Sequence, residues 1–290
     1  MRLAGYENFK FTKKLFFLSG VLPIIDYYYE PFSREKTKTY KNEKREIKPI
    51  DYNIEEQLEL IKNFHFQDEL LKLPREQINK DIYFYNNDNF TAGDADYYYS
   101  LIRYLKPKRI IEVGSGFSTL LALEAIKINQ IENNAYNCQL TCIEPYEFKW
   151  LKNKNVNFIE SLVENVELDV FKTLESNDIL FVDSSHIIKP KGDLLYIFMD
   201  ILPVLKSGVF IHFHDIFSPW DYPQHWIREK LLFWNEQYLL EAFLSHNKDY
   251  KVVCSLNFLK NNYWDNIKNY LPVLNEYPNK EPGSFWIIKN

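Results

Sequence analysis

Short apolar runs alternate with longer amphipathic stretches over the last two thirds of the chain, a pattern that predicts strands separated by helices. Residues 178–183 form a continuous apolar run between two acids, as expected of a parallel strand buried on both faces. Residues 194–205 then place apolar side chains on one helical face, ahead of the next strand at 208–215. The alternation predicts an α/β fold in which helices cover both faces of a mostly parallel sheet.

Seven strands fit this pattern, and the last two are predicted to close the sheet as an antiparallel pair. Their expected positions are 109–113, 140–144, 156–159, 178–183, 208–215, 251–255 and 284–288. One long helix is predicted from about residue 223 to 245, because Ile227, Leu231, Trp234, Tyr238 and Ala242 fall in register on one face.

The first 92 residues give a weaker pattern and are predicted to form an elaboration of a domain that spans 93–290. Residues 34–48 are dense in charge. A solvated, mobile loop explains that density, and so does a lid or a basic strip that faces an acidic or phosphorylated substrate.

Two helices are expected before the first core strand. Residues 54–73 have helical spacing, and Pro74 ends that helix. Asp94 or Asp96 can cap a second helix, which Pro107 ends.

The composition is that of a globular protein, since 46% of the 290 residues are hydrophobic. The net charge of -5 argues against a nucleic-acid partner. Three cysteines form no disulfide framework and fit a reduced, cytoplasmic protein. No apolar run is long enough to span a membrane. Residues 15–25 resemble a signal peptide only faintly, because no small-residue cleavage site follows and Pro23 interrupts the run.

The stretch 109–119 carries the first sign of chemistry. A buried strand ends in a turn with Gly114 and Gly116, and a helix begins near Ser118. Such a turn presents backbone N–H groups to a polar or anionic ligand, and glycine lets that ligand approach closely. A dinucleotide fingerprint would need a third glycine where Thr119 stands.

Acidic residues and a histidine stand at the ends of the following strands. Glu144 ends the second strand, where a carboxylate can accept hydrogen bonds from ribose hydroxyls or cap the chain near Tyr146. Asp183 ends the fourth strand, and His214-Asp215 end the fifth. Adjacent strand ends face one crevice in an open parallel sheet, so these three side chains are expected to converge.

The run Glu112-Val-Gly-Ser-Gly116 resembles motif I of the class I S-adenosylmethionine (SAM) methyltransferases, whose fold is a Rossmann-like doubly wound sheet. The resemblance implies SAM as cofactor, with the acidic residue helping to hold its methionine end. The residues expected to contact the cofactor are Glu112, Gly114, Ser115, Gly116, Ser118, Thr119, Glu144, Pro145, Ser161, Asp183 and Ser184.

Asp183, His214 and Asp215 resemble the metal triad of catechol O-methyltransferase and of macrolide and aminocoumarin sugar O-methyltransferases. Those families use Asp with Asp-Asn or Asp-Asp, whereas this chain has His214 in place of the first residue of the pair. Mg²⁺ prefers oxygen ligands, and a histidine favours Mn²⁺, Fe²⁺ or Zn²⁺. The alternative is a structural His214–Asp215 hydrogen-bonded pair without a metal.

A longer set of motifs resembles the bacterial family called methyltransferase type 24, over about residues 85–256. The motifs are Asp183-Ser-Ser-His186, Leu205-Lys-Ser-Gly208, His212-Phe-His-Asp-Ile-Phe217, the aromatic run 219–226 and the stretch 234–243. The resemblance implies a role among glycan and natural-product biosynthetic enzymes.

Methyl transfer requires an aligned acceptor and a route for its proton. His186 is the candidate general base, with Asp183 and His214 as the other catalytic residues, and a helix-start role is the alternative for His186. His212 is assigned to the core or to support of the site. The expected acceptor contacts are Tyr222, His225, Trp226 and Glu236. A packed aromatic lid is the alternative for the three aromatic residues, and bracing of the site loop is the alternative for Glu236.

The sequence therefore predicts a SAM-dependent O-methyltransferase that acts on a small polar acceptor, a sugar or a glycan or natural-product precursor, with the help of a divalent metal. The N-terminal 92 residues would cap the acceptor pocket, and a homo-oligomer is compatible with the chain. Three alternatives stay open: a metal-free methyltransferase with His186 or His214 as base, an NAD-dependent oxidoreductase, and a non-catalytic binding module.

Overall fold

The computed structural model divides the chain into two compact units. The first unit consists of Met1–Lys44 and Asp221–Phe233, and the second of Arg45–Trp220 and Trp234–Asn290. The structure describes residues 10–21, 24, 26, 29, 31, 33–146, 151 and 154–290. The signal-peptide-like stretch 15–25 therefore lies partly outside the described residues, at positions 22, 23 and 25.

The first unit contains the short helices α1 (Lys10–Leu18), α2 (Arg34–Thr39) and α10 (Gln224–Arg228). The Ser33 hydroxyl caps α2 by accepting the Lys36 N–H at 3.4 Å. The Tyr40 hydroxyl donates to the Tyr222 carbonyl at 2.6 Å. The charge-dense segment 34–48 thus begins as a capped helix, which the sequence pattern did not predict.

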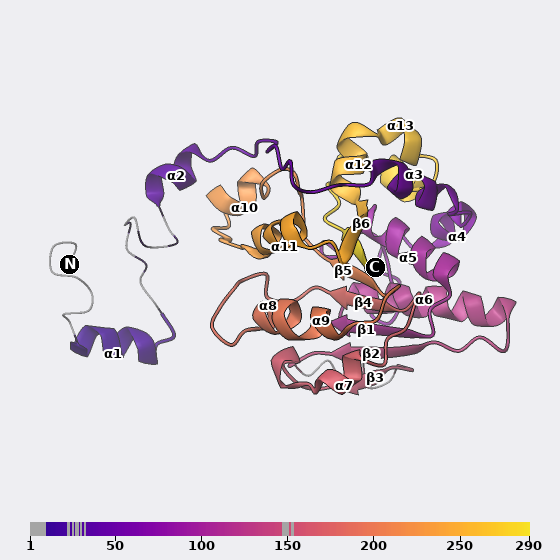
Figure 1. The fold of residues 1–290 in the computed structure, drawn as a ribbon, viewed down its shortest axis with the longest axis horizontal. Helices are drawn as coiled ribbons and strands as arrows, with labels where there is room; N and C mark the ends of the chain where they lie inside the picture. Colours follow the sequence, from indigo (N-terminus) through magenta and orange to yellow (C-terminus); the bar gives the residue numbers. More distant parts are fainter. Residues whose placement is uncertain are drawn as a thin grey trace. The chain divides into compact units, whose positions relative to one another are not determined.

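The second unit is built on a seven-stranded sheet in the order β3-β2-β1-β4-β5-β7-β6 (Figure 1). The strands are β1 (Arg109–Val113), β2 (Gln139–Ile143), β3 (Asn157–Ile159), β4 (Ile179–Val182), β5 (Phe210–Phe213), β6 (Tyr250–Ser255) and β7 (Phe285–Lys289). The first five pair in parallel, and β7 runs antiparallel to both β5 and β6. The predicted fold, mostly parallel and doubly wound with antiparallel strands at the end, is confirmed.

Side chains alternate between the two faces of this sheet and feed two apolar cores. Ile110 and Phe181 point to the face covered by α5 (Asp94–Leu105) and α6 (Phe117–Glu132). Ile111 and Leu180 point to the opposite face, which holds residues 197–205 and α11 (Glu236–His246). Burial on both faces explains why the central strands are continuous apolar runs.

Among the described residues, no helix is both long and apolar enough to cross a membrane. Shorter helices complete the second unit. They are α3 (Ile54–Lys62), α4 (Gln67–Lys72), η3 (Val163–Asn165), α7 (Leu168–Phe171), α8 (Asp193–Tyr196), the π-helix η4 (Ile197–Ile201), α9 (Leu202–Val204), α12 (Leu256–Asn262), α13 (Trp264–Ile267) and α14 (Pro272–Glu276).

Two helices that were predicted to be continuous are each interrupted in the structure. Residues 54–73 form α3 and α4, separated where the Asn63 N–H bonds the Leu60 carbonyl at 3.1 Å and ends α3. Residues 223–245 form α10 and α11, separated by residues 229–235. Leu231 has a φ of 55°, in the left-handed region, so a right-handed helix cannot pass through it.

The turn after β1 brings two strand ends into close contact. Gly114 has a φ of 85°, and a Cβ on it would lie 1.8 Å from the Asp183 carbonyl oxygen. Gly116 differs, because a Cβ there would meet no atom within 4 Å. Gly114 is therefore required by the backbone, whereas Gly116 leaves open space beside the turn.

Gly114→Ala should lower the free energy of unfolding by about 2–5 kcal/mol, because it combines a left-handed backbone with a steric clash. Gly116→Ala is the matched control and should change it by less than about 1 kcal/mol. Denaturant unfolding of both variants without cofactor measures the difference. Equal stability of the two variants would contradict this account of the turn.

Candidate functional site

Two cavities of about 440 and 360 Å³ open at the carboxyl ends of the parallel strands. Both are lined by Gly114, Glu144 and Asp183, which follow β1, β2 and β4. The cavities therefore meet at the three strand ends that the sequence singled out, where a doubly wound sheet binds its ligand.

The larger cavity follows the glycine turn, with Ser115, Gly116 and Ser118 in its wall. Four further lining residues come from the segment before α5, and the sequence analysis did not find them. They are Gln77, Lys80, Asn89 and Phe90. That segment has no regular period, so only the tertiary fold reveals that it reaches the turn.

The smaller cavity lies beside Pro145 and Ser184, as expected for cofactor contacts. Leu162 and Val163, which follow β3, also line it and were missed. Ser161 was predicted as a contact, but it is absent from the residues that line either cavity, and its hydroxyl donates to the Leu162 carbonyl at 3.0 Å. Leu162 and Val163 were missed because two adjacent apolar residues that line a cavity give no polar signal in the sequence.

Backbone amides hold Glu144 in place between the two cavities. Its Oε1 accepts the Tyr146 N–H at 3.1 Å, and its Oε2 accepts the Ser115 N–H at 3.4 Å. Burial raises its pKa above the usual value, although both backbone hydrogen bonds oppose that shift. The carboxylate thus caps the chain locally and also faces the space where a ligand would lie.

Glu112 lies beneath the turn and does not line either cavity. Its carboxylate accepts the Thr119 hydroxyl at 2.5 Å and the Tyr98 hydroxyl at 3.2 Å. Thr119 Oγ1 in turn accepts the Gly116 N–H at 3.1 Å. Burial raises the Glu112 pKa to about 7. In this structure Glu112 and Thr119 brace the glycine turn from below.

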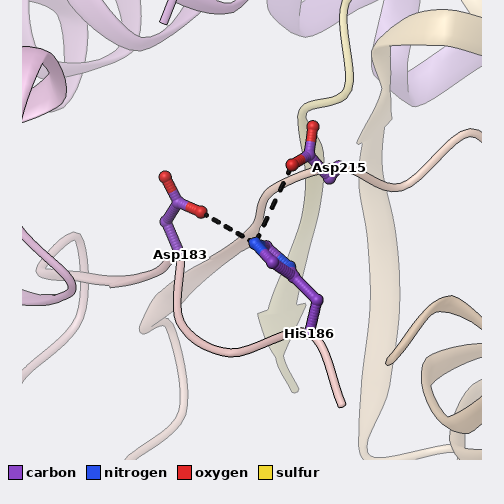
Figure 2. Close-up of side chains that lie close together, drawn as sticks. All are labelled: Asp183, His186 and Asp215. Carbon is purple, nitrogen blue, oxygen red and sulfur yellow. Dashed lines mark ion pairs between the residues drawn. The ribbon is translucent and has the colours of Figure 1, made fainter. Parts of the chain in front are cut away.

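A polar cluster occupies the ends of β4 and β5 (Figure 2). His186 Nε2 lies 3.3 Å from Asp183 Oδ1 and 3.8 Å from Asp215 Oδ2. One donor atom from each of these three residues lies within 4.8 Å of the other two. Two carboxylates and one imidazole form a donor set suited to a divalent cation, so the residues fit a metal.

His214 lies near the same two carboxylates. Its Nδ1 is 3.7 Å from Asp183 Oδ1 and 3.5 Å from Asp215 Oδ1, and its Nε2 is 3.8 Å from Asp94 Oδ2. The three residues expected to converge do so. The group of donor atoms that could hold an ion, however, contains His186, and His214 is absent from it.

The charges of the cluster shift the pKa of each member. Burial would lower the His186 pKa, but the hydrogen bonds and charges of Asp183 and Glu236 outweigh it and raise the pKa to about 10. The His214 pKa is raised because Asp215 and Asp183 outweigh the effect of burial. Burial would raise the Asp183 pKa, yet His214 and His186 hold it well below its usual value.

His212 belongs to the core rather than to the cluster. Its ring stacks on Phe181 with centroids 4.0 Å apart, and its Nε2 lies 3.0 Å from the Ser284 hydroxyl. Burial lowers its pKa well below the usual value. A neutral, packed imidazole agrees with the expectation that His212 supports the site from within the sheet.

The residues predicted as acceptor contacts separate into two groups. Glu236 is buried and its Oε2 lies 2.8 Å from His186 Nδ1. Tyr222, His225 and Trp226 belong to the first unit, where the Tyr222 and Trp226 rings stack with centroids 6.4 Å apart. A role for these four residues in binding the acceptor stays a prediction.

Comparisons with known proteins find one matching family and one relative. Residues 111–216 match the model of a family described as a methyltransferase domain. An uncharacterized protein of Archaeoglobus fulgidus is 32% identical over 167 residues, which are 52% of this chain and 73% of that protein.

Solved structures give more distant likenesses. The SAM complex of the O-methyltransferase TomG from Streptomyces achromogenes, which is involved in tomaymycin synthesis, is 14% identical with a TM-score of 0.40, covering 81% of this chain and 90% of that one. An O-methyltransferase from Bacillus cereus in complex with SAH is 12% identical with a TM-score of 0.35, also covering 81% and 90%. Likenesses this low say nothing about the substrate of this chain.

The matched family spans the strands whose ends form both cavities and the polar cluster. The chain belongs to the class I SAM-dependent methyltransferases, in the methyltransferase type 24 family.

Proposed function

We propose that the protein transfers the methyl group of SAM to a hydroxyl oxygen of a small polar acceptor, a sugar or a natural-product precursor, with the help of a divalent cation. The observation that carries the proposal is the double position of Asp183. It lines both cavities of the glycine turn, and it is also a member of the polar cluster with His186 and Asp215.

The residues at the glycine turn fit the cofactor. Glu144 would accept the ribose hydroxyls, and the open space beside Gly116 leaves the turn accessible to a ligand. When bound, SAM supplies an electrophilic methyl group on its sulfonium sulfur. The protein's own contribution is to hold the acceptor oxygen in line with that methyl group. It would also hold the hydroxyl proton of the acceptor close to the polar cluster, which can accept it.

The charge balance of the cluster favours a cation. Four carboxylates lie within 3.8 Å of the imidazoles of His186 and His214, and they belong to Asp94, Asp183, Asp215 and Glu236. The carboxylates outnumber the imidazoles two to one, and buried carboxylates need a partner. A divalent cation, when bound at Asp183, His186 and Asp215, lowers the pKa of a coordinated hydroxyl.

A metal-free methyltransferase with His186 as base is the second candidate. The observation that favours it is the position of His186 Nε2, 3.3 Å from Asp183 and in the same cluster. In that case the neutral form of the imidazole would accept the proton of the acceptor, and the raised pKa of His186 makes that form the minor one near neutral pH.

Polar groups in the larger cavity support a hydroxylated acceptor. Gln77, Lys80 and Asn89 line that cavity and can hydrogen-bond hydroxyls.

A cytoplasmic location, a homo-oligomer and an acceptor-capping role for residues 1–92 are further parts of the proposal. The three cysteines are free and buried, which supports a reducing compartment.

A direct test of the function is the release of S-adenosylhomocysteine from SAM in the presence of a panel of sugars and aryl alcohols. Turnover with a hydroxyl acceptor, but not with its deoxy or O-methylated analogue, is the expected result. EDTA should stop this turnover, and Mn²⁺ should restore it more fully than Mg²⁺ because of the histidine ligand. Full turnover in EDTA would favour the metal-free candidate.

Glu144→Gln should weaken SAM binding by about 10- to 100-fold, because a charged hydrogen-bond acceptor contributes about 1.5–3 kcal/mol. Isothermal titration with SAM measures the change. Glu175→Gln is the control, since Glu175 is exposed and pairs with Arg109 at the opposite end of the sheet. If Glu144→Gln bound SAM as tightly as this control, Glu144 would not contact the cofactor.

Asp183→Asn and His186→Gln should each weaken the binding of Mn²⁺ by more than about 10-fold, since each removes a ligand atom of the cluster. His214→Gln should change Mn²⁺ binding much less, because His214 is absent from that donor group. Titration of the metal-free protein with Mn²⁺, followed by electron paramagnetic resonance, measures the affinities. A loss in His214→Gln but not in His186→Gln would restore the assignment expected from the sequence.

A further inference from the structure

His186 contacts a segment that lies about fifty residues further along the chain, through Nδ1 and through the face of its ring. Its Nδ1 lies 2.8 Å from Glu236 Oε2, and its ring stacks on Trp234 with centroids 4.2 Å apart and an interplanar angle of 29°. The imidazole therefore has little freedom to rotate, and its Nε2 faces Asp183 and Asp215 (Figure 2).

The backbone of the same segment fixes the loop that carries His186. The His186 carbonyl accepts the N–H groups of Asn235 and Glu236 at 3.0 and 3.3 Å. Asn235 Oδ1 accepts the Ile188 N–H at 2.7 Å. His186 itself has a φ of 59°, a left-handed conformation that is uncommon for residues other than glycine, although histidine adopts it more often than most. A strained backbone persists where the surrounding structure over-determines it, as these contacts do.

Glu236 and its neighbour Gln237 have separate tasks. Gln237 accepts the Phe217 N–H at 2.7 Å and donates to the Trp220 carbonyl at 2.8 Å, so it braces the loop after β5. Glu236 Oε2 meets the His186 ring, while its buried Oε1 has no hydrogen-bond partner among the described residues. A buried carboxylate with one unpaired oxygen is unfavourable for stability, so its presence beside His186 indicates a role in the site.

We propose that Glu236 is a positioning residue: it accepts the Nδ1–H of His186 and thereby directs Nε2 to the space between Asp183 and Asp215. A carboxylate behind an imidazole fixes which ring nitrogen carries the proton, fixes the ring's orientation and makes the other nitrogen a better ligand. The inference rests on the proposed function, because that function needs Nε2 as a metal ligand or as a base.

Glu236→Gln tests the proposal without changing the size of the side chain. An amide can donate to Nδ1 as well as accept from it, so the position of the ring proton is no longer fixed. Mn²⁺ alone should bind about 10- to 100-fold more weakly to this variant, the loss typical of removing such a supporting carboxylate. SAM affinity and the melting temperature should stay near the wild-type values.

Glu241→Gln is the matched control on the same helix. Glu241 is buried and receives two hydrogen bonds from Arg45, at 2.6 and 2.7 Å, so its loss breaks an ion pair away from His186. This control should lower the melting temperature and leave Mn²⁺ affinity unchanged. A purely structural role for Glu236 would give the same result, and Mn²⁺ binding by Glu236→Gln within twofold of wild type would overturn the proposal.

Nitrogen-15 NMR of labelled histidines separates this inference from the proposed function. The chain has only six histidines, and the signal of His186 can be assigned with His186→Gln. In metal-free wild type the Nδ1–H of His186 should resonate far downfield and exchange slowly, and in Glu236→Gln it should move upfield and exchange faster. An unchanged signal overturns the inference, whereas an absence of Mn²⁺ binding by wild type overturns only the metal in the proposed function.

Discussion

The structure depends on the parallel register of β1, β4 and β5, which continues past the strands themselves. The Asp183 N–H bonds the Val113 carbonyl at 2.9 Å, and the His214 N–H bonds the Val182 carbonyl at 3.1 Å. These bonds carry the ladder one residue beyond each strand and fix where Asp183 and His214 leave the sheet. Because Gly114 has no side chain, the turn after β1 can lie against the Asp183 carbonyl. The close packing of these strand ends places the two cavities and the polar cluster side by side.

In the polar cluster, burial and the attraction between opposite charges shift the pKa values in opposite directions. Burial alone would favour neutral side chains, yet Asp183 and the two imidazoles of His186 and His214 favour one another's charged forms. Removing an imidazole from such a group would leave buried carboxylates without a partner, which is strongly destabilising. The segment from Trp234 to Glu236 therefore matters to the site, although it lies far from the cofactor motifs in sequence.

Much of the fold could be predicted from the sequence because its signals are local. Apolar runs marked the strands, and the glycine turn and the acids at strand ends marked the mouths of the cavities. The break between α10 and α11 could not be predicted, since apolar residues keep a helical period across it. That break follows from Leu231 and from the His186 carbonyl, which binds the N–H groups that begin α11.

The sequence indicated which residues come together at the site better than it indicated their roles. Asp183, His186 and Asp215 could be found because each follows a strand, but the pairing of His186 with Glu236 joins positions fifty residues apart and has no sequence period. Gln77 and Lys80 lie in a segment without regular spacing, so their place in the larger cavity depends on tertiary packing. Glu112 was predicted to contact the cofactor. In the structure its carboxylate accepts hydrogen bonds from Tyr98 and Thr119 and lines neither cavity.

The central claim is that the cofactor cavities and the polar cluster form one site through Asp183. A crystal structure with S-adenosylhomocysteine and Mn²⁺, using anomalous scattering to locate the metal, tests it most directly. The account predicts a manganese peak bounded by Asp183, His186 and Asp215, with the cofactor lying on the turn at Gly114 and Gly116. A cofactor bound away from that turn, or a cluster without metal beside a bound cofactor, would contradict it.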